Sequence, residues 1–86
     1  MTVGTGAAAT APAREYRPLP MVVLANGRPV DLPDGATVAA LIAEMGLGGR
    51  VVVVEHNGEP VDRRAVGATV LHDGDRCEVV RAVAGG

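Results

Sequence analysis

Two consecutive glycines, Gly85 and Gly86, follow a strand-like segment, residues 76–83, at the end of the 86-residue sequence. Glycine has no Cβ and is costly to order, so a pair of glycines adds nothing to a hydrophobic core. The pair suits a tail that passes through a narrow slot and presents its terminal carboxylate to the chemistry of another protein. The plainer interpretation is a frayed end, because chain ends are commonly poorly ordered. The rest of the chain has to decide between the two.

The other residues with reactive side chains have simpler explanations. Cys77 stands in an alternating strand-like segment, which predicts a small buried side chain rather than a reactive thiol. His56 and His72 lie beside turns without a local partner pattern, so they are predicted to be surface histidines. The sequence Asp73-Gly74-Asp75 lacks the spaced acids and the final glutamate of a calcium loop, and predicts a turn. We therefore expect no metal site, and a single cysteine excludes an internal disulfide.

The composition predicts one small, β-rich domain. Hydrophobic residues make up 48% of the chain, yet Phe and Trp are absent and the single tyrosine is Tyr16. The core must then be aliphatic, and its many valines favour strands. A net charge of −2 gives no basic stripe for nucleic acid. No apolar run suits a membrane span or a signal peptide, so a cytoplasmic location is the expectation. A monomer is expected for so small and mildly acidic a chain.

The chain divides into an extension, a folded domain and a tail. Residues 1–20 are rich in Ala, Gly, Thr and Pro without periodicity, which is typical of a disordered extension. An internal translation start at Met21 is compatible with this pattern. The folded domain is expected at residues 21–83, and a flexible Gly-Gly tail at residues 84–86.

The first half of the domain reads as a hairpin followed by a helix. Residues 21–25 and 28–32 are short apolar runs separated by Asn26-Gly27, the signal for a type I′ turn. Thr37 is the predicted N-cap of the helix. Apolar residues at helical spacing form one face before a glycine cap: Val38, Leu41, Ile42, Met45 and then Gly46.

The second half reads as three further strands. Residues 51–55 form a third strand, predicted to be buried on both faces because of its valines. Asn57-Gly58 turns the chain into a short segment, residues 59–61, and residues 62–71 form an irregular connection. The last strand spans residues 76–83, and we expect it to lie parallel to the first strand at the sheet centre. One helix can cover one face of this mixed sheet of four to five strands, which is an α+β arrangement.

Several short pieces match a known pattern in order and spacing: residues 21–27, 37–38, 51–54, 57–59, 61–63, 71–80 and 82–86. Together they resemble the ubiquitin-like β-grasp fold and, more narrowly, the ThiS family of sulfur carriers in thiamine biosynthesis. The resemblance covers residues 21–86. This chain departs from the family in having Asp62 where proline is common and Val66 where a large aromatic is common. The departures predict a looser turn before Arg63 and a smaller local cluster.

The resemblance implies that Gly86 carries the chemistry. An E1-like adenylyltransferase would attach AMP from ATP to the Gly86 carboxylate, because a free carboxylate is a poor electrophile. Sulfur from a cysteine desulfurase or another persulfide donor would then leave a thiocarboxylate, which a thiazole synthase receives. Gly85 would let the tail thread into the partner. The chain has no Gly-rich phosphate loop, so we expect it to bind no cofactor and to be a cosubstrate rather than an enzyme.

The body of the domain should supply a docking face. If Cys77 and Val79 point toward the helix, alternation turns Val80 outward, and in the first strand it turns Leu24 outward. On neighbouring strands, Leu24 and Val80 would form an exposed apolar patch beside the tail, a typical partner site. Scattered surface hydrophobes are the ordinary alternative. The expected partner-binding residues are Leu24, Val80, Ala82 and Ala84.

Three alternative functions remain open at this point. The first is a sulfur carrier for molybdopterin or cysteine synthesis, although molybdopterin carriers usually show Phe and Pro in a last strand that here reads Val79-Val80-Arg81-Ala82-Val83. The second is a ubiquitin-like modifier conjugated through Gly86 to lysines of other proteins. The third is an interaction module in which Gly85 and Gly86 play no part.

Overall fold

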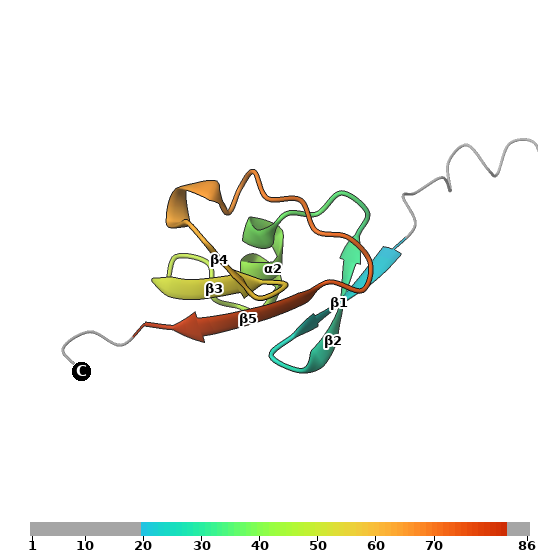
Figure 1. Ribbon diagram of the computed structural model, residues 1–86, viewed down its shortest axis with the longest axis horizontal. Coiled ribbons are helices and arrows are strands. Elements are labelled where there is room, and N and C mark those ends of the chain that lie inside the picture. The colour runs from blue at the N-terminus through green and yellow to red at the C-terminus, as the bar shows by residue number, and fades with distance from the viewer. Residues whose placement is uncertain (1–19, 83–86) are drawn as a thin grey trace, which may run out of the picture.

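The structure, a computed structural model, describes residues 20–82 (Figure 1). Its elements are β1 (Pro20–Ala25), β2 (Arg28–Pro33), α2 (Val38–Glu44), β3 (Val52–His56), β4 (Glu59–Val61), the 3₁₀ turn η1 (Arg63–Ala65) and β5 (Arg76–Arg81). The predicted extension therefore lies outside the described residues except for Pro20, which begins β1. Val83 and the predicted tail, residues 84–86, also lie outside them.

The five strands form one mixed sheet in the order β2-β1-β5-β3-β4. The strands β1 and β5 are parallel neighbours, as predicted, and β5 occupies the centre of the sheet. The other pairs, β1 with β2, β3 with β5 and β3 with β4, are antiparallel. Figure 1 shows α2 packed across one side of this sheet. The predicted α+β class and the single covering helix are confirmed.

Two Asn-Gly pairs make the two hairpin turns. Asn26 and Gly27 have φ values of 54° and 82°, and Asn57 and Gly58 have φ values of 51° and 87°. A type I′ turn requires positive φ at both central residues, which asparagine tolerates and glycine adopts freely. Both turns lie where the sequence predicts them.

The helix α2 begins and ends at the predicted signals. The Thr37 hydroxyl accepts a hydrogen bond from the backbone N–H of Ala40 at 3.3 Å. Gly46, with φ of 77°, follows the last turn as a C-terminal cap. Val38 and Leu41 are fully buried beneath the helix. No helix within residues 20–82 has the length and apolar character needed to cross a membrane.

The core lies between α2 and one face of the sheet. Its buried residues are Met21, Val23, Ala25, Leu32, Ala36, Val38, Leu41, Ile42, Val54, Leu71, Cys77 and Val79. The prediction that the third strand is buried on both faces is wrong: Val54 is buried, whereas Val51 and Val53 are 55% and 60% exposed. The reason is that one helix covers one face, so alternate residues of β3 point away from the core.

Candidate functional site

The central strand leads directly toward the predicted tail. Ala82, the last described residue, donates its backbone N–H to the carbonyl oxygen of Val51 at 2.8 Å. Arg81 pairs with Val52 in the antiparallel β3–β5 ladder. The sheet therefore fixes the point from which residues 83–86 continue. Ala84, Gly85 and Gly86 lie outside the described residues, so the roles predicted for them remain predictions.

The side of the sheet opposite α2 is called here the outer face. In β5, Cys77 and Val79 are buried against the helix, while Glu78 and Val80 point outward and Ala82 beyond them is exposed. This alternation is the predicted one. Val80 is 58% exposed, so a large apolar side chain faces solvent on the central strand.

The structure does not bring Leu24 and Val80 together as predicted. Leu24 is half-buried and lies opposite Arg76 in the β1–β5 ladder, whereas Val80 lies opposite Val53 on β3. Arg76 and Val80 are four residues apart on one strand, a separation of about 13 Å. The sequence interpretation missed Val53 because it placed residues 51–55 inside the core. The exposed apolar neighbours on the outer face are thus Val53 and Val80.

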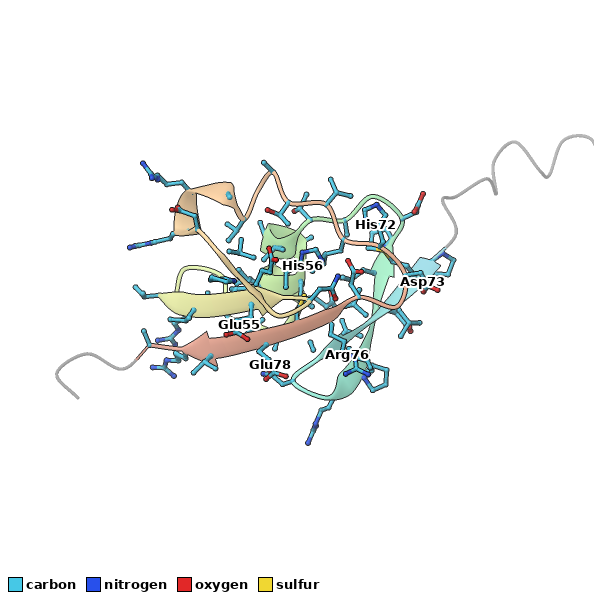
Figure 2. All side chains as sticks on the ribbon, in the orientation of Figure 1. Glu55, His56, His72, Asp73, Arg76 and Glu78 are labelled. Atoms are coloured by element: carbon cyan, nitrogen blue, oxygen red, sulfur yellow. The ribbon has the colours of Figure 1, made fainter. Side chains whose placement is uncertain are left out.

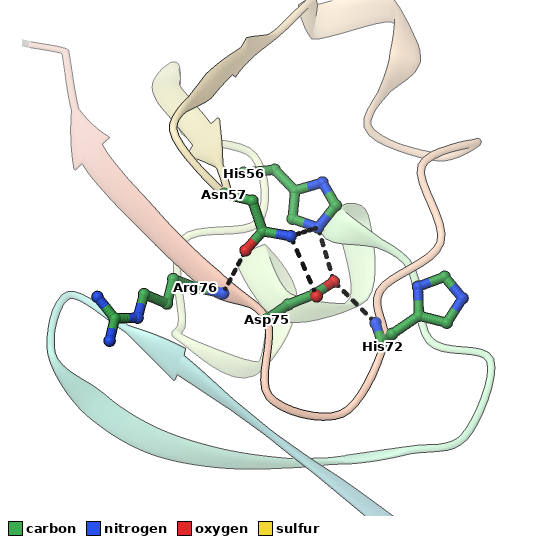
Figure 3. Close-up of polar contacts among 5 residues, drawn as sticks. All are labelled: His56, Asn57, His72, Asp75 and Arg76. Carbon is green, nitrogen blue, oxygen red and sulfur yellow. Dashed lines mark hydrogen bonds and ion pairs between the residues drawn. The ribbon is translucent and has the colours of Figure 1, made fainter.

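A hydrogen-bond network joins the end of β3 to the start of β5 (Figure 3). The Asp75 carboxylate lies 2.7 Å from His56 Nε2 and accepts hydrogen bonds from the backbone N–H of His72 at 2.9 Å and from Asn57 Nδ2 at 3.1 Å. Asn57 Oδ1 accepts from the backbone N–H of Arg76 at 2.9 Å. Burial alone would raise the pKa of Asp75, but the bonds from His56, His72 and Asn57 outweigh it and lower that pKa.

The prediction that His56 is a surface histidine is wrong. Its side chain is 20% exposed, and it pairs with Asp75, whose side chain is 13% exposed. The two residues are distant in sequence and meet only because β3 and β5 are neighbours. No local sequence pattern therefore predicts this pair. His72 is exposed, as predicted. The network fastens the turn before β5 to the turn after β3, which is a structural role.

Cys77 is the small buried side chain that the sequence predicts. It is 2% exposed, and burial raises the pKa of its thiol, with the charges of Asp75 and Glu78 adding to the effect. The thiol is therefore the protonated, poorly nucleophilic form at neutral pH. Within residues 20–82, no three side chains of His, Cys, Asp or Glu are grouped as metal ligands would be. Gly74, with φ of 88°, places the neighbouring acids in the predicted turn.

The two departures from the family pattern have different outcomes. Asp62 does not loosen the turn: its carboxylate accepts a hydrogen bond from the backbone N–H of Arg64 at 2.8 Å and caps η1. That bond, with a second from the Arg64 side chain, lowers the pKa of Asp62. Val66 lines a largely apolar pocket of about 250 Å³ between α2, the start of β3 and η1. Valine at position 66 thus forms a smaller apolar cluster, as predicted, and the pocket lies beside it.

Comparison with known proteins agrees with this architecture. A family model described as the ThiS family matches residues 21–86. The crystal structure of the thiamine biosynthesis protein ThiS from Geobacter metallireducens is 32% identical, with a TM-score of 0.65 over 77% of this chain and 100% of that chain. A solution structure of a thiamine biosynthesis protein from the same organism is 35% identical, with a TM-score of 0.63 over 77% of this chain and 88% of that one.

Two longer proteins also contain a similar segment. Thiazole synthases from Paramagnetospirillum magneticum and Magnetococcus marinus are 35% and 36% identical over 66 residues, which is 77% of this chain. The chain spans only 20% of the length of each of these relatives. The family match covers residues 21–82 of the described domain and continues to residue 86. This chain therefore belongs to the ThiS family.

Proposed function

We propose that this chain carries sulfur for thiazole formation as a thiocarboxylate on Gly86. The observation that carries the proposal is the family match, which extends over residues 21–86 and so includes both terminal glycines. The geometry is compatible with it. The backbone N–H of Ala82 is bonded to Val51 at the end of the central strand, so the body is anchored only a few residues before Gly86.

The chemistry requires the carboxylate to be activated before sulfur can enter. Attack of the carboxylate oxygen on the α-phosphate of ATP forms an acyl adenylate and releases pyrophosphate. The terminal sulfur of a protein persulfide then attacks the carbonyl carbon, and the C–O bond to AMP breaks. A partner's thiol next attacks the inner sulfur of the resulting acyl disulfide, which releases the thiocarboxylate and leaves a disulfide on the partner. Gly86 of this chain supplies the acyl group that is activated, so the chain acts as a cosubstrate rather than an enzyme.

Three partner proteins are needed for this sequence of reactions. An E1-like adenylyltransferase binds the ATP, and a cysteine desulfurase or another persulfide donor supplies sulfur. A thiazole synthase takes the sulfur from the thiocarboxylate. The similarity to segments of two proteins named thiazole synthase supports this last partner.

The intact mass of the untagged protein tests the proposal. Incubation with ATP, the adenylyltransferase of the same organism and a persulfide source should raise the mass by the difference between sulfur and oxygen. Fragmentation should place the change on Gly86, and a chain that lacks Gly86 should show no change. An unchanged mass with partners shown active would contradict the proposal. Adducts on lysines of other proteins would instead identify a ubiquitin-like modifier.

A further inference from the structure

The pocket beside Val66 has the composition of a binding site. Its volume is about 250 Å³, and its apolar wall consists of Ala39, Ile42, Val52, Val54, Val61 and Val66. These side chains come from α2, β3, β4 and the segment after η1. Sites that bind small groups combine such an apolar wall with a few well-placed polar groups. The polar groups at the mouth of this pocket therefore indicate what kind of group it can bind.

Arginines surround the mouth of the pocket. Arg50, just before β3, and Arg63, in η1, line it directly. Arg81 lies opposite the first residue of β3, so its side chain is on the same side of the sheet as the pocket. Figure 2 shows nitrogen-tipped side chains that extend from η1 and from the neighbouring ends of β3 and β5. Within residues 20–82 these three arginines form no ion pair, because the nearby Asp62 pairs with Arg64. The mouth is therefore suited to a carboxylate.

The described part of the chain ends at the same pocket. Ala82 donates its backbone N–H to the carbonyl oxygen of Val51 at 2.8 Å, and Val51 is one of the residues that line the pocket. Residues 83–86 therefore begin at the wall of the pocket, and four extended residues span at most about 14 Å. Their sequence is Val-Ala-Gly-Gly. It offers one large apolar side chain and, under the proposed function, a terminal carboxylate.

We propose that the pocket binds the chain's own C-terminal segment, residues 83–86, with Val83 against the apolar wall and the Gly86 carboxylate paired with the arginines at the mouth. This inference rests on the proposed function, in which Gly86 bears the terminal carboxylate. Charge selects this segment over the other end of the chain, because residues 1–19 contain Arg14 and Arg17 against one acid, Glu15. Those residues also join the domain at the start of β1, at the opposite end of the molecule from η1 (Figure 1).

Docking of the tail controls how much of the Gly86 carboxylate is available. Gly85 and Gly86 are costly to order, so the contact is weak and the tail exchanges between pocket and solvent. The adenylyltransferase takes up the undocked form, so the pocket reduces the fraction of chains that can be activated at any moment. A thiocarboxylate carries the same single negative charge as a carboxylate. The same arginines therefore bind the tail again once it carries sulfur.

Solution NMR of the full chain tests the inference without any partner protein. The methyl groups of Val83 should show nuclear Overhauser effects to methyl groups of the pocket wall, and added salt should weaken these effects by screening the carboxylate. Arg50→Gln and Arg63→Gln should each reduce them, because each removes a cation from the mouth. Arg28→Gln, at the start of β2 and outside the pocket, is the matched control and should leave them unchanged. Val66→Phe fills the pocket without removing a charge, and it should abolish them in a domain that remains folded.

Three results would overturn the inference. The first is the absence of any Overhauser effect between Val83 and the pocket wall in the unmodified chain. The second is an equal effect in the unmodified chain, Arg50→Gln and Arg63→Gln, since charge would then not hold the tail. The third is an effect seen only between differently labelled copies, which would make the occupant the tail of a second molecule. The mass measurement separates this inference from sulfur transfer. A chain that gains sulfur without a docked tail contradicts the docking alone, and a docked tail that gains no sulfur contradicts the proposed transfer.

Discussion

At the scale of single residues, Asp75 and Asn57 each make three side-chain polar contacts in the network between β3 and β5. The Asp75 carboxylate is hydrogen-bonded by His56, Asn57 and His72, and the first two are separated from His72 in sequence by β4, η1 and a loop. Glu55 and Glu78 show the opposite situation, because both are exposed and lie opposite each other on neighbouring strands. Asp75 is thus held within a hydrogen-bond network, whereas these two carboxylates face solvent.

The stability of the domain should depend on the charge of Asp75. Its pKa is lowered from the ordinary value of 3.8, so the stabilisation is fully present above that value and is lost as the pH falls through the folded-state pKa. Asp75→Asn should cost about 1–3 kcal/mol of unfolding free energy at neutral pH. Urea unfolding at several pH values should show the difference between the two proteins shrinking in acid. An unchanged midpoint at neutral pH would contradict this role, and Asp34→Asn in an exposed loop is the control.

The residue scale also shows where sequence reasoning succeeds. Cys77 could be assigned as buried because alternation along one strand is a local signal. The partner of His56 could not be assigned, because the register that brings Asp75 to it depends on how two distant strands align. The sequence of one strand shows which of its residues alternate between the two faces, but it does not show how that strand aligns with a distant one.

At the scale of elements, the turn between β1 and β2 does more than reverse the chain. Asn26 Oδ1 accepts a hydrogen bond from the backbone N–H of Val79 at 2.8 Å, and Asn26 Nδ2 donates to the carbonyl oxygen of Val79 at 3.0 Å. The side-chain amide thus imitates a strand residue and extends the pairing of β5 beyond the end of β1. Asn26, a turn residue, thereby adds two hydrogen bonds to the central strand β5.

Removing that amide should loosen the central strand. Asn26→Gly keeps a residue that tolerates positive φ, so it removes the two hydrogen bonds without straining the turn. The unfolding free energy should fall by about 1–3 kcal/mol. Hydrogen exchange should show faster exchange of the Val79 amide, with the amide of Val54 on β3 as the internal reference. Equal exchange rates in both proteins would show that the two hydrogen bonds between Asn26 and Val79 do not stabilise β5.

Element boundaries were largely predictable, and element surroundings were not. The Asn-Gly turns, the Thr37 cap and the helical spacing are short-range signals, and each lies where the sequence predicts. The burial of β3 was predicted wrongly because a run of valines does not reveal how many layers cover a strand. The neighbours of Val80 were predicted wrongly because β1 pairs with β5 only through Leu24 and Ala25. A strand order alone does not define a register.

At the scale of the whole molecule, the space beside Val66 is the clearest weakness in packing. The pocket of about 250 Å³ is lined mainly by aliphatic side chains from α2, β3 and the segment after β4. Exposed residues, among them Gly49, Arg50 and Val51, form part of its wall, so the pocket is open to solvent on one side. The absence of Phe and Trp from the whole chain leaves the molecule with few means of filling it.

A larger side chain at position 66 should therefore stabilise the domain. Val66→Phe should raise the unfolding free energy by about 0.5–2 kcal/mol, because the ring would cover the apolar wall of this open pocket. Thermal unfolding followed by circular dichroism measures the change. Val70→Phe, at a site that is 45% exposed, should give little or no gain. A lower melting temperature for Val66→Phe would show that the pocket cannot accept a ring without displacing its walls.

The pairing of β1 with β5 also has a consequence for synthesis on the ribosome. The centre of the sheet is occupied by the strand that is made after the other four, and its contacts with β1 join residues more than half the chain apart. Until β5 has emerged, the two hairpins have no common strand and cannot close one core. The tail follows β5 directly, so a nascent chain that exposes Gly86 already contains every strand of the fold. Under the proposed function of Gly86, a chain that lacks β5 also lacks the residue that would be activated, so incomplete chains cannot enter sulfur transfer.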